Sequence, residues 1–182
     1  MGAILDIIGS LALRGVIAAL VINLIILLRD TQYERTSHAT TTQNLTTAGR
    51  VIENDLKYAG YSTMTTPFLI ATGQEVKFIS DLDDNSGTPI DTINFKIAAD
   101  PSGEPNSKVI LRVKNGGLPL YIAKGEVTLA FQYYDSLSAV TAILSKIKSV
   151  SVSLTLKNTY TPNDTSFSTI KKELKVFPVN LN

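Results

Sequence analysis

The chain has 182 residues and nearly balanced charge, with 17 Lys and Arg against 16 Asp and Glu and a formal net charge of +1. This balance argues against a nucleic-acid-binding protein, which normally carries a basic stripe. The sequence has no cysteine, which excludes disulfides, thiolate metal sites and thiol nucleophiles, and its single histidine leaves little for histidine-based catalysis. We therefore expect that the protein is not an enzyme and takes no cofactor.

The first predicted element is an apolar helix long enough to cross a membrane. Between Ile7 and Leu28 the only full charge is Arg14. These 22 residues span roughly 33 Å, whereas the hydrocarbon core of a bilayer is about 30 Å thick. A cleaved signal peptide is the alternative, but no Lys or Arg precedes the apolar run and no small-residue cleavage site follows it. We interpret residues 1–30 as a membrane-spanning or membrane-derived helix that also suits a filament core.

The sequence beyond Leu28 predicts that the helix continues over residues 31–60 with one apolar face. The apolar positions that recur at helical spacing are Leu45, Ala48, Ile52, Leu56 and Ala59. Gly60 follows the last of them, where a helix commonly ends. Six threonines between residues 36 and 47 favour a local bend or a melted turn. The residues expected to pack this helix on the next domain are Val51, Ile52, Leu56 and Ala59.

After Tyr61 the apolar period changes from 3.6 residues to two, which is typical of antiparallel strands with one buried face. The ranges with clear alternation are 93–97, 109–113, 127–133 and 150–156. Shorter candidate strands cover 75–79, 120–123 and 172–177, and Asp-, Asn- and Gly-rich turns separate several of them. We predict an α+β fold in which the long N-terminal helix packs on a mainly antiparallel β domain of five to seven strands over residues 61–182.

Five short motifs carry a family resemblance. In chain order they are VIENDLKYAGY at 51–61, DTINF at 91–95, GEVTLAFQYYD at 125–135, IKSVSVSL at 147–154 and VFPVNL at 176–181. With the order of helix and sheet, they resemble the type IV pilin superfamily, and within it the branch of minor pilins and J-type minor pseudopilins. That family has a basic leader and a Glu at the fifth position of the processed chain. Here no basic leader is present and the nearest acid is Asp6.

The resemblance implies a structural subunit of an extracellular helical filament, either a type IV pilus-like fimbrium or a secretion pseudopilus. Its partners would be copies of itself or other pilins, and before assembly its apolar helix would lie in the inner membrane of a bacterium. No nucleic acid is expected among the partners. The alternative is a membrane-anchored extracytoplasmic binding or adhesion domain that does not polymerise. Major and minor, tip-located subunits both stay open.

Asp6 and Arg14 are ionisable residues in an otherwise apolar segment, where such groups are costly and usually mark pairing or function. Within one helix they are about 12 Å apart along the axis, too far for a salt bridge. Two parallel copies staggered by about 12 Å would bring them level. We therefore predict an Asp6–Arg14 assembly contact between subunits. Hydration of both groups near the membrane surface is the simpler alternative, and the resemblance offers a neighbour's N-terminal amine as a rival partner for Asp6.

An acidic stretch around a glycine turn offers a weak calcium candidate. Its oxygen-bearing residues are Asp81, Asp83, Asn85 and Asp91. Gly87 falls one place late for an EF-hand loop, and Thr92 stands where the bidentate Glu should be. We favour an ordinary acidic turn, and no other cluster of residues suggests a metal or catalytic site.

Overall fold

The computed structural model describes residues 2–61, 66–80, 90–159 and 167–179. The chain divides into two compact units, Met1–Ala39 and Thr40–Asn182. The helices and strands are α1 (Gly2–Lys57), β1 (Phe68–Ala71), β2 (Glu75–Ser80), β3 (Asp91–Ala99), β4 (Lys108–Lys114), β5 (Leu120–Tyr134), the short 3₁₀ helix η1 (Leu144–Lys146), β6 (Ser149–Thr159) and β7 (Phe167–Val176). The predicted α+β fold is confirmed.

Helix α1 contains 56 residues and runs through the threonine-rich stretch without interruption. A melted turn is therefore not present there. The helix ends at Lys57, and Gly60 adopts a left-handed φ of 81° in the turn that follows. This conformation favours glycine. It lets the Gly60 N–H donate a hydrogen bond of 2.9 Å to the carbonyl oxygen of Ile79 in β2, which links the end of the helix to the sheet.

The strands form one seven-stranded antiparallel sheet in which spatial order follows chain order. Strand β1 was not predicted. The predicted strands 120–123 and 127–133 are two halves of β5, whose first half pairs with β4 and whose second half pairs with β6. The change of partner occurs at Gly125, where φ is 128°. A glycine in a strand interior commonly marks such a break in the ladder.

The turn between β1 and β2 is bound to β5, which lies four places from β1 in the sheet order. The Phe131 N–H donates to the Gly73 carbonyl over 2.9 Å. The hydroxyl of Tyr133 donates to the carbonyl oxygens of Thr72 and Glu75. Burial raises the pKa of Tyr133, and the charge of Glu75 adds to the effect. These bonds hold the two halves of the sheet together, so that the sheet curls around its buried face.

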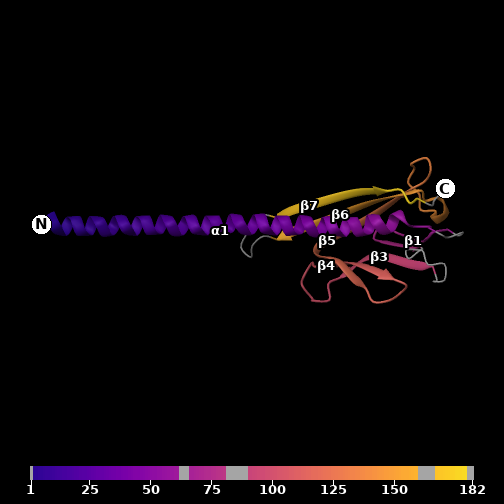
Figure 1. Cartoon of the computed structure of the whole chain (residues 1–182), viewed down its shortest axis with the longest axis horizontal. Coiled ribbons are helices and arrows are strands. Elements are labelled where there is room, and N and C mark those ends of the chain that lie inside the picture. The colour runs from indigo at the N-terminus through magenta and orange to yellow at the C-terminus, as the bar shows by residue number, and fades with distance from the viewer. Residues whose placement is uncertain (1, 62–65, 81–89, 160–166, 180–182) are drawn as a thin grey trace. The chain divides into compact units, whose positions relative to one another are not determined.

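The C-terminal part of α1 packs on this buried face (Figure 1). The helix and the turn after it contribute Leu45, Ala48, Ile52, Leu56 and Ala59, each at most 1% exposed. The largest fully buried residues facing them from the sheet are Phe68, Phe78, Phe95, Ile93, Ile110 and Leu154. Of the four residues expected to pack the helix on the sheet, three lie in the core, and Val51 lies at its margin and is partly buried.

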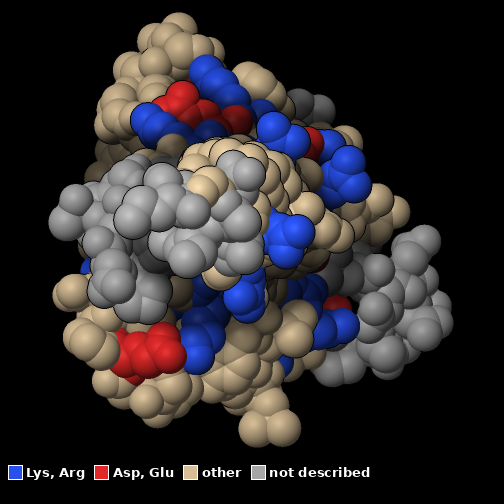
Figure 2. Space-filling view, turned by 90° about the vertical axis from the view of Figure 1, so that its left-hand side faces the viewer, with Lys and Arg blue, Asp and Glu red and all other residues tan. Residues whose placement is uncertain are grey.

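Strand β7 lies at one edge of the sheet and is rich in lysine. Figure 2 shows Lys and Arg spread over the face of the molecule that it draws, with Asp and Glu beside them in places. Lys171, Lys172 and Lys175 belong to β7, and lysine on an edge strand discourages pairing with another chain. The side chain of Lys172 packs against Gly49 of α1, where an added Cβ would meet it at 3.1 Å. The edge is therefore both charged and in close contact with the helix.

We expect a chain that begins at Arg29 to be soluble, monomeric and cooperatively folded. The core residues all belong to the unit Thr40–Asn182, whereas the exposed apolar side chains between Leu11 and Leu28 would be removed. Analytical ultracentrifugation and a thermal unfolding curve measure both properties. Aggregation, or a melting curve without a cooperative transition, would contradict the division of the chain into an apolar helical segment and a unit, Thr40–Asn182, that folds without it.

In that shortened chain, Leu56→Ala should lower the free energy of unfolding by about 2–5 kcal/mol, because Leu56 is fully buried and its truncation leaves a cavity. The matched control is Leu118→Ala, since Leu118 is 94% exposed. It should change stability by no more than about 0.5 kcal/mol. Urea unfolding measures both values. Equal effects from the two substitutions would argue against the packing of α1 on the sheet.

Candidate functional site: the exposed apolar helix

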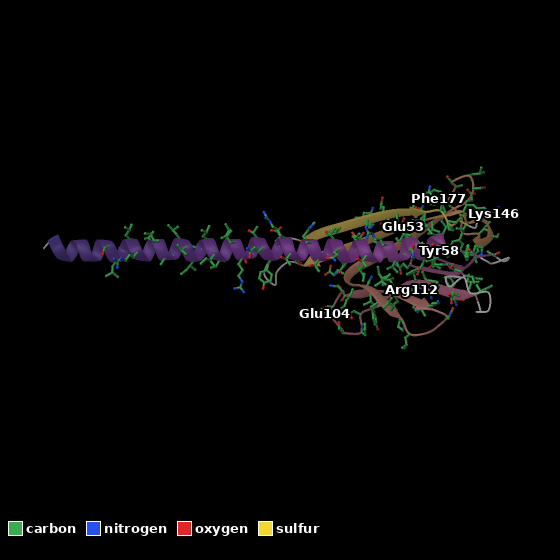
Figure 3. All side chains as sticks on the ribbon, viewed as in Figure 1. Glu53, Tyr58, Glu104, Arg112, Lys146 and Phe177 are labelled. Atoms are coloured by element: carbon green, nitrogen blue, oxygen red, sulfur yellow. The ribbon has the colours of Figure 1, made fainter. Side chains whose placement is uncertain are left out.

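The N-terminal part of α1 presents apolar side chains on all sides. Every large apolar residue between Leu11 and Leu28 is at least 49% exposed. Figure 3 shows side chains projecting both above and below this part of the helix. Among the described residues, α1 is long and apolar enough from Gly9 onward to cross a membrane. A helix that is apolar all round must be surrounded by lipid or by other protein, so this segment is the candidate functional site.

The two predicted assembly residues belong to this helix. The backbone of Asp6 lies in α1, and its side chain is outside what the structure describes. Arg14 is exposed. Because the helix is continuous between them, the two positions are about 12 Å apart along its axis, and the fold of one chain does not bring them together. Any Asp6–Arg14 contact has to form between two chains.

A buried ion pair holds the amphipathic part of α1 on the sheet. The Arg112 Nε of β4, labelled in Figure 3, donates a hydrogen bond to Asp55 Oδ2 of α1. The Asp55 side chain is 9% exposed and that of Arg112 is 20% exposed. Sequence reasoning missed this pair. The spacing contained a signal, since Asp55 lies three residues after Ile52 and four before Ala59, which places a carboxylate on the core-facing side of the helix.

Breaking this pair should cost far more than breaking an exposed pair of the same helix. Asp55→Leu leaves the Arg112 guanidinium largely buried without its partner, which should cost about 3–5 kcal/mol. The double variant Asp55→Leu/Arg112→Leu should cost less than the sum of the two single variants, as urea unfolding would measure.

The matched control is the exposed pair of Lys57 and Glu53, in which Lys57 Nζ lies 2.8 Å from Glu53 Oε1. Substituting both of its members should give a coupling of about 0.3–0.5 kcal/mol, as for other exposed helix pairs. A coupling between Asp55 and Arg112 as small as that of the control pair would contradict the role assigned to the buried pair.

The calcium candidate receives no support from the part of it that the structure describes. Asp81, Asp83 and Asn85 lie outside the described residues. Asp91 is buried, and both of its carboxylate oxygens are engaged. The Lys114 ammonium lies 2.9 Å from Oδ2, and the Asn115 side-chain amide donates to Oδ1 over 2.7 Å. Within the ranges that the structure describes, no group of three His, Cys, Asp or Glu residues could hold a metal ion.

A second buried carboxylate serves the loop between β3 and β4. Asp100 accepts hydrogen bonds from the Ser102 backbone N–H and the Ser107 hydroxyl, and Lys124 lies 3.1 Å away. The backbone bond from Ser102 is the largest cause that holds the pKa of Asp100 well below its usual range, followed by the bond from Ser107. Because these donors belong to the loop and to β5, the carboxylate orders the loop.

The comparisons with known proteins were negative. Protein-family models, curated proteins and solved structures gave no match to this chain. The family resemblance therefore rests on the short motifs and on the architecture alone. The long apolar helix, packed through its C-terminal part on an antiparallel sheet, is consistent with a pilin-like architecture.

Proposed function

We propose that the protein is a structural subunit of a helical, pilus-like or pseudopilus filament on the bacterial surface. One observation carries the proposal: a single helix is the central packing element of a β domain in one half and exposes apolar side chains on every side in the other. The exposed half can lie in a membrane as a monomer. Copies of the same helix can then replace lipid around it, since both environments are apolar.

The branch of the family is a finer part of the same proposal. The motif VIENDLKYAGY covers the end of α1 and the turn after it, and IKSVSVSL leads into and covers much of β6. Both contribute to the core through Ile52, Leu56, Val152 and Leu154. These correspondences support a minor pilin or J-type minor pseudopilin, whose place would be near the tip of the filament.

Asp6 and Arg14 would supply the register of assembly. In a dry bundle of apolar helices, a charge without a partner is strongly penalised. A stagger of about 12 Å between parallel neighbours places Asp6 of one copy beside Arg14 of the next. Such a pair fixes how far the two helices slide past one another, and it gives the filament a direction of growth.

Shearing cells that express the chain tests the proposal. Filaments should appear in the sheared, sedimented fraction and in electron micrographs. If the chain reaches the outer surface of the inner membrane but never sediments as filaments, alone or with other pilins, it is instead a membrane-anchored binding or adhesion domain.

Charge reversal tests the contact between subunits. Asp6→Arg and Arg14→Asp should each abolish filaments, because an unpartnered buried charge costs about 3–5 kcal/mol. The double reversal should restore them at least in part. Arg35→Asp is the matched control, since it reverses a charge of α1 beyond the apolar segment and should leave filaments intact. Normal filament yield from Arg14→Asp would exclude the Asp6–Arg14 contact, whereas loss from Asp6→Arg alone would favour the N-terminal amine as the partner of Asp6.

A further inference from the structure

The length of the exposed apolar segment sets where a bilayer would begin and end along α1. Leu28 is the last residue of the apolar run, and Arg29 follows it. Counting back 20 residues from Leu28 at about 1.5 Å each gives about 30 Å and reaches Gly9. Arg29 therefore stands at one boundary between hydrocarbon and headgroups.

Arg29 is part of a cation–π pair at this boundary. Its guanidinium carbon lies 5.8 Å from the centroid of the Tyr33 ring, one helical turn further on. Tyr33 is 61% exposed, so the side chain is available to the surroundings of the helix. Tyrosine is enriched at membrane surfaces because its ring suits the apolar side and its hydroxyl suits the wet side.

The neighbouring acids lie on another side of the helix. With about 100° of rotation per residue, Tyr33 is about 40° from Arg29, whereas Asp30 and Glu34 are about 100° and 140° away. Arg35 is about 120° away in the opposite sense. Arg29 itself is therefore at least about 100° from both carboxylates, and Tyr33 lies between Arg29 and Asp30. An anion can approach the guanidinium from the side of Arg29 that faces away from Asp30 and Glu34.

We propose that Arg29 and Tyr33 form the interfacial anchor of α1, with the Arg29 guanidinium binding the phosphate group of a membrane phospholipid. A guanidinium presents paired N–H donors that match phosphate oxygens, and the tyrosine ring holds it in place. The inference rests on the membrane-bound stage of the proposed function.

Arg14 lies near the other end of this counted span. It is five residues inside Gly9, which is about 7.5 Å along the axis. An arginine side chain can extend over such a distance to place its charge at the nearer surface. Arg29 at one surface and Arg14 at the other would then hold the helix at a fixed depth, and residues 15–28 between them contain no charged side chain.

The absence of tryptophan from the sequence makes the depth measurable. Tyr33→Trp keeps an aromatic ring at the anchor and gives the full chain a single tryptophan. The chain is reconstituted into phosphatidylcholine vesicles that contain lipids brominated at known depths. We expect bromines near the headgroups to quench the emission of the introduced tryptophan most strongly, and bromines near the bilayer centre to quench it least.

Arg29→Gln in the Tyr33→Trp background tests the role of the guanidinium. Without it, the tryptophan should move toward the hydrocarbon, with blue-shifted emission and strongest quenching by deeper bromines. Arg35→Gln is the matched control, because it removes the same charge from another face of the helix and should leave the depth unchanged. Adding anionic phosphatidylglycerol to the vesicles separates a general attraction to negative surfaces from contact with the phosphate that both lipids carry.

Three results would overturn the anchor. The first is that deep bromines quench the introduced tryptophan most strongly before any further substitution. The second is that Arg29→Gln and Arg35→Gln change the depth of the tryptophan equally. The third is that the tryptophan lies near the headgroups only when phosphatidylglycerol is present. None of these measurements needs filaments. A chain that is anchored as proposed but never polymerises would overturn only the filament function, and filaments from a chain without this anchor would overturn only the present inference.

Discussion

The contact on which the rest of the structure depends is the burial of one stripe of α1 against the curled sheet. The stripe supplies the apolar layer that the sheet alone lacks, because the inward-facing side chains of an open sheet need a second layer to cover them. Ile52 and Leu56 are fully buried in that layer. Because of the same contact, the part of α1 from Thr40 onward belongs to the compact unit that contains the sheet.

The ion pair between Asp55 and Arg112 restricts this contact to one rotation and one axial position of the helix. Apolar packing along a helix tolerates small rotations and slides, whereas a hydrogen-bonded pair of buried charges is satisfied in one geometry. Asp55 faces the sheet from the last turns of α1, and Arg112 reaches it from β4, 57 positions later in the chain. Gly49 permits the close approach of β7 at another point of the helix. Contacts from β4 and β7, two strands that are distant in the sequence, therefore fix the position of the helix on the sheet.

Much of the fold could be predicted because its signals are local. Helical spacing identified Ile52, Leu56 and Ala59, and alternation identified most of β3 to β6. The features that were missed depend on partners distant in sequence. Strand β1 has only four residues, too few for alternation to be evident, and it is stabilised by pairing with β2. The continuity of β5 through Gly125 depends on β4 and β6 together.

The candidate site was predictable to a different extent. Composition located the apolar segment and its two charges, because hydropathy needs no knowledge of tertiary contacts. The pairing of Asp55 with Arg112 was not predictable, since neither local sequence indicates which distant residue is the partner. The placement of Arg29 over Tyr33 required the structure as well, although the spacing of four residues permits it in any helix.

If the proposed function holds, the charge of Arg14 is stabilised differently in the bilayer and in the filament. In a bilayer its long side chain can reach the nearer surface, so the charge stays hydrated and needs no protein partner. In the core of a filament no surface lies within reach, and the same charge requires a carboxylate from a neighbour. The apolar residues around it gain little from the transfer, because lipid and protein solvate them about equally well. The free-energy difference between the two environments then depends mainly on the charged groups. A segment with one cation among its apolar residues and one acid near its start is therefore suited to leave the membrane only when the next subunit is present to receive it.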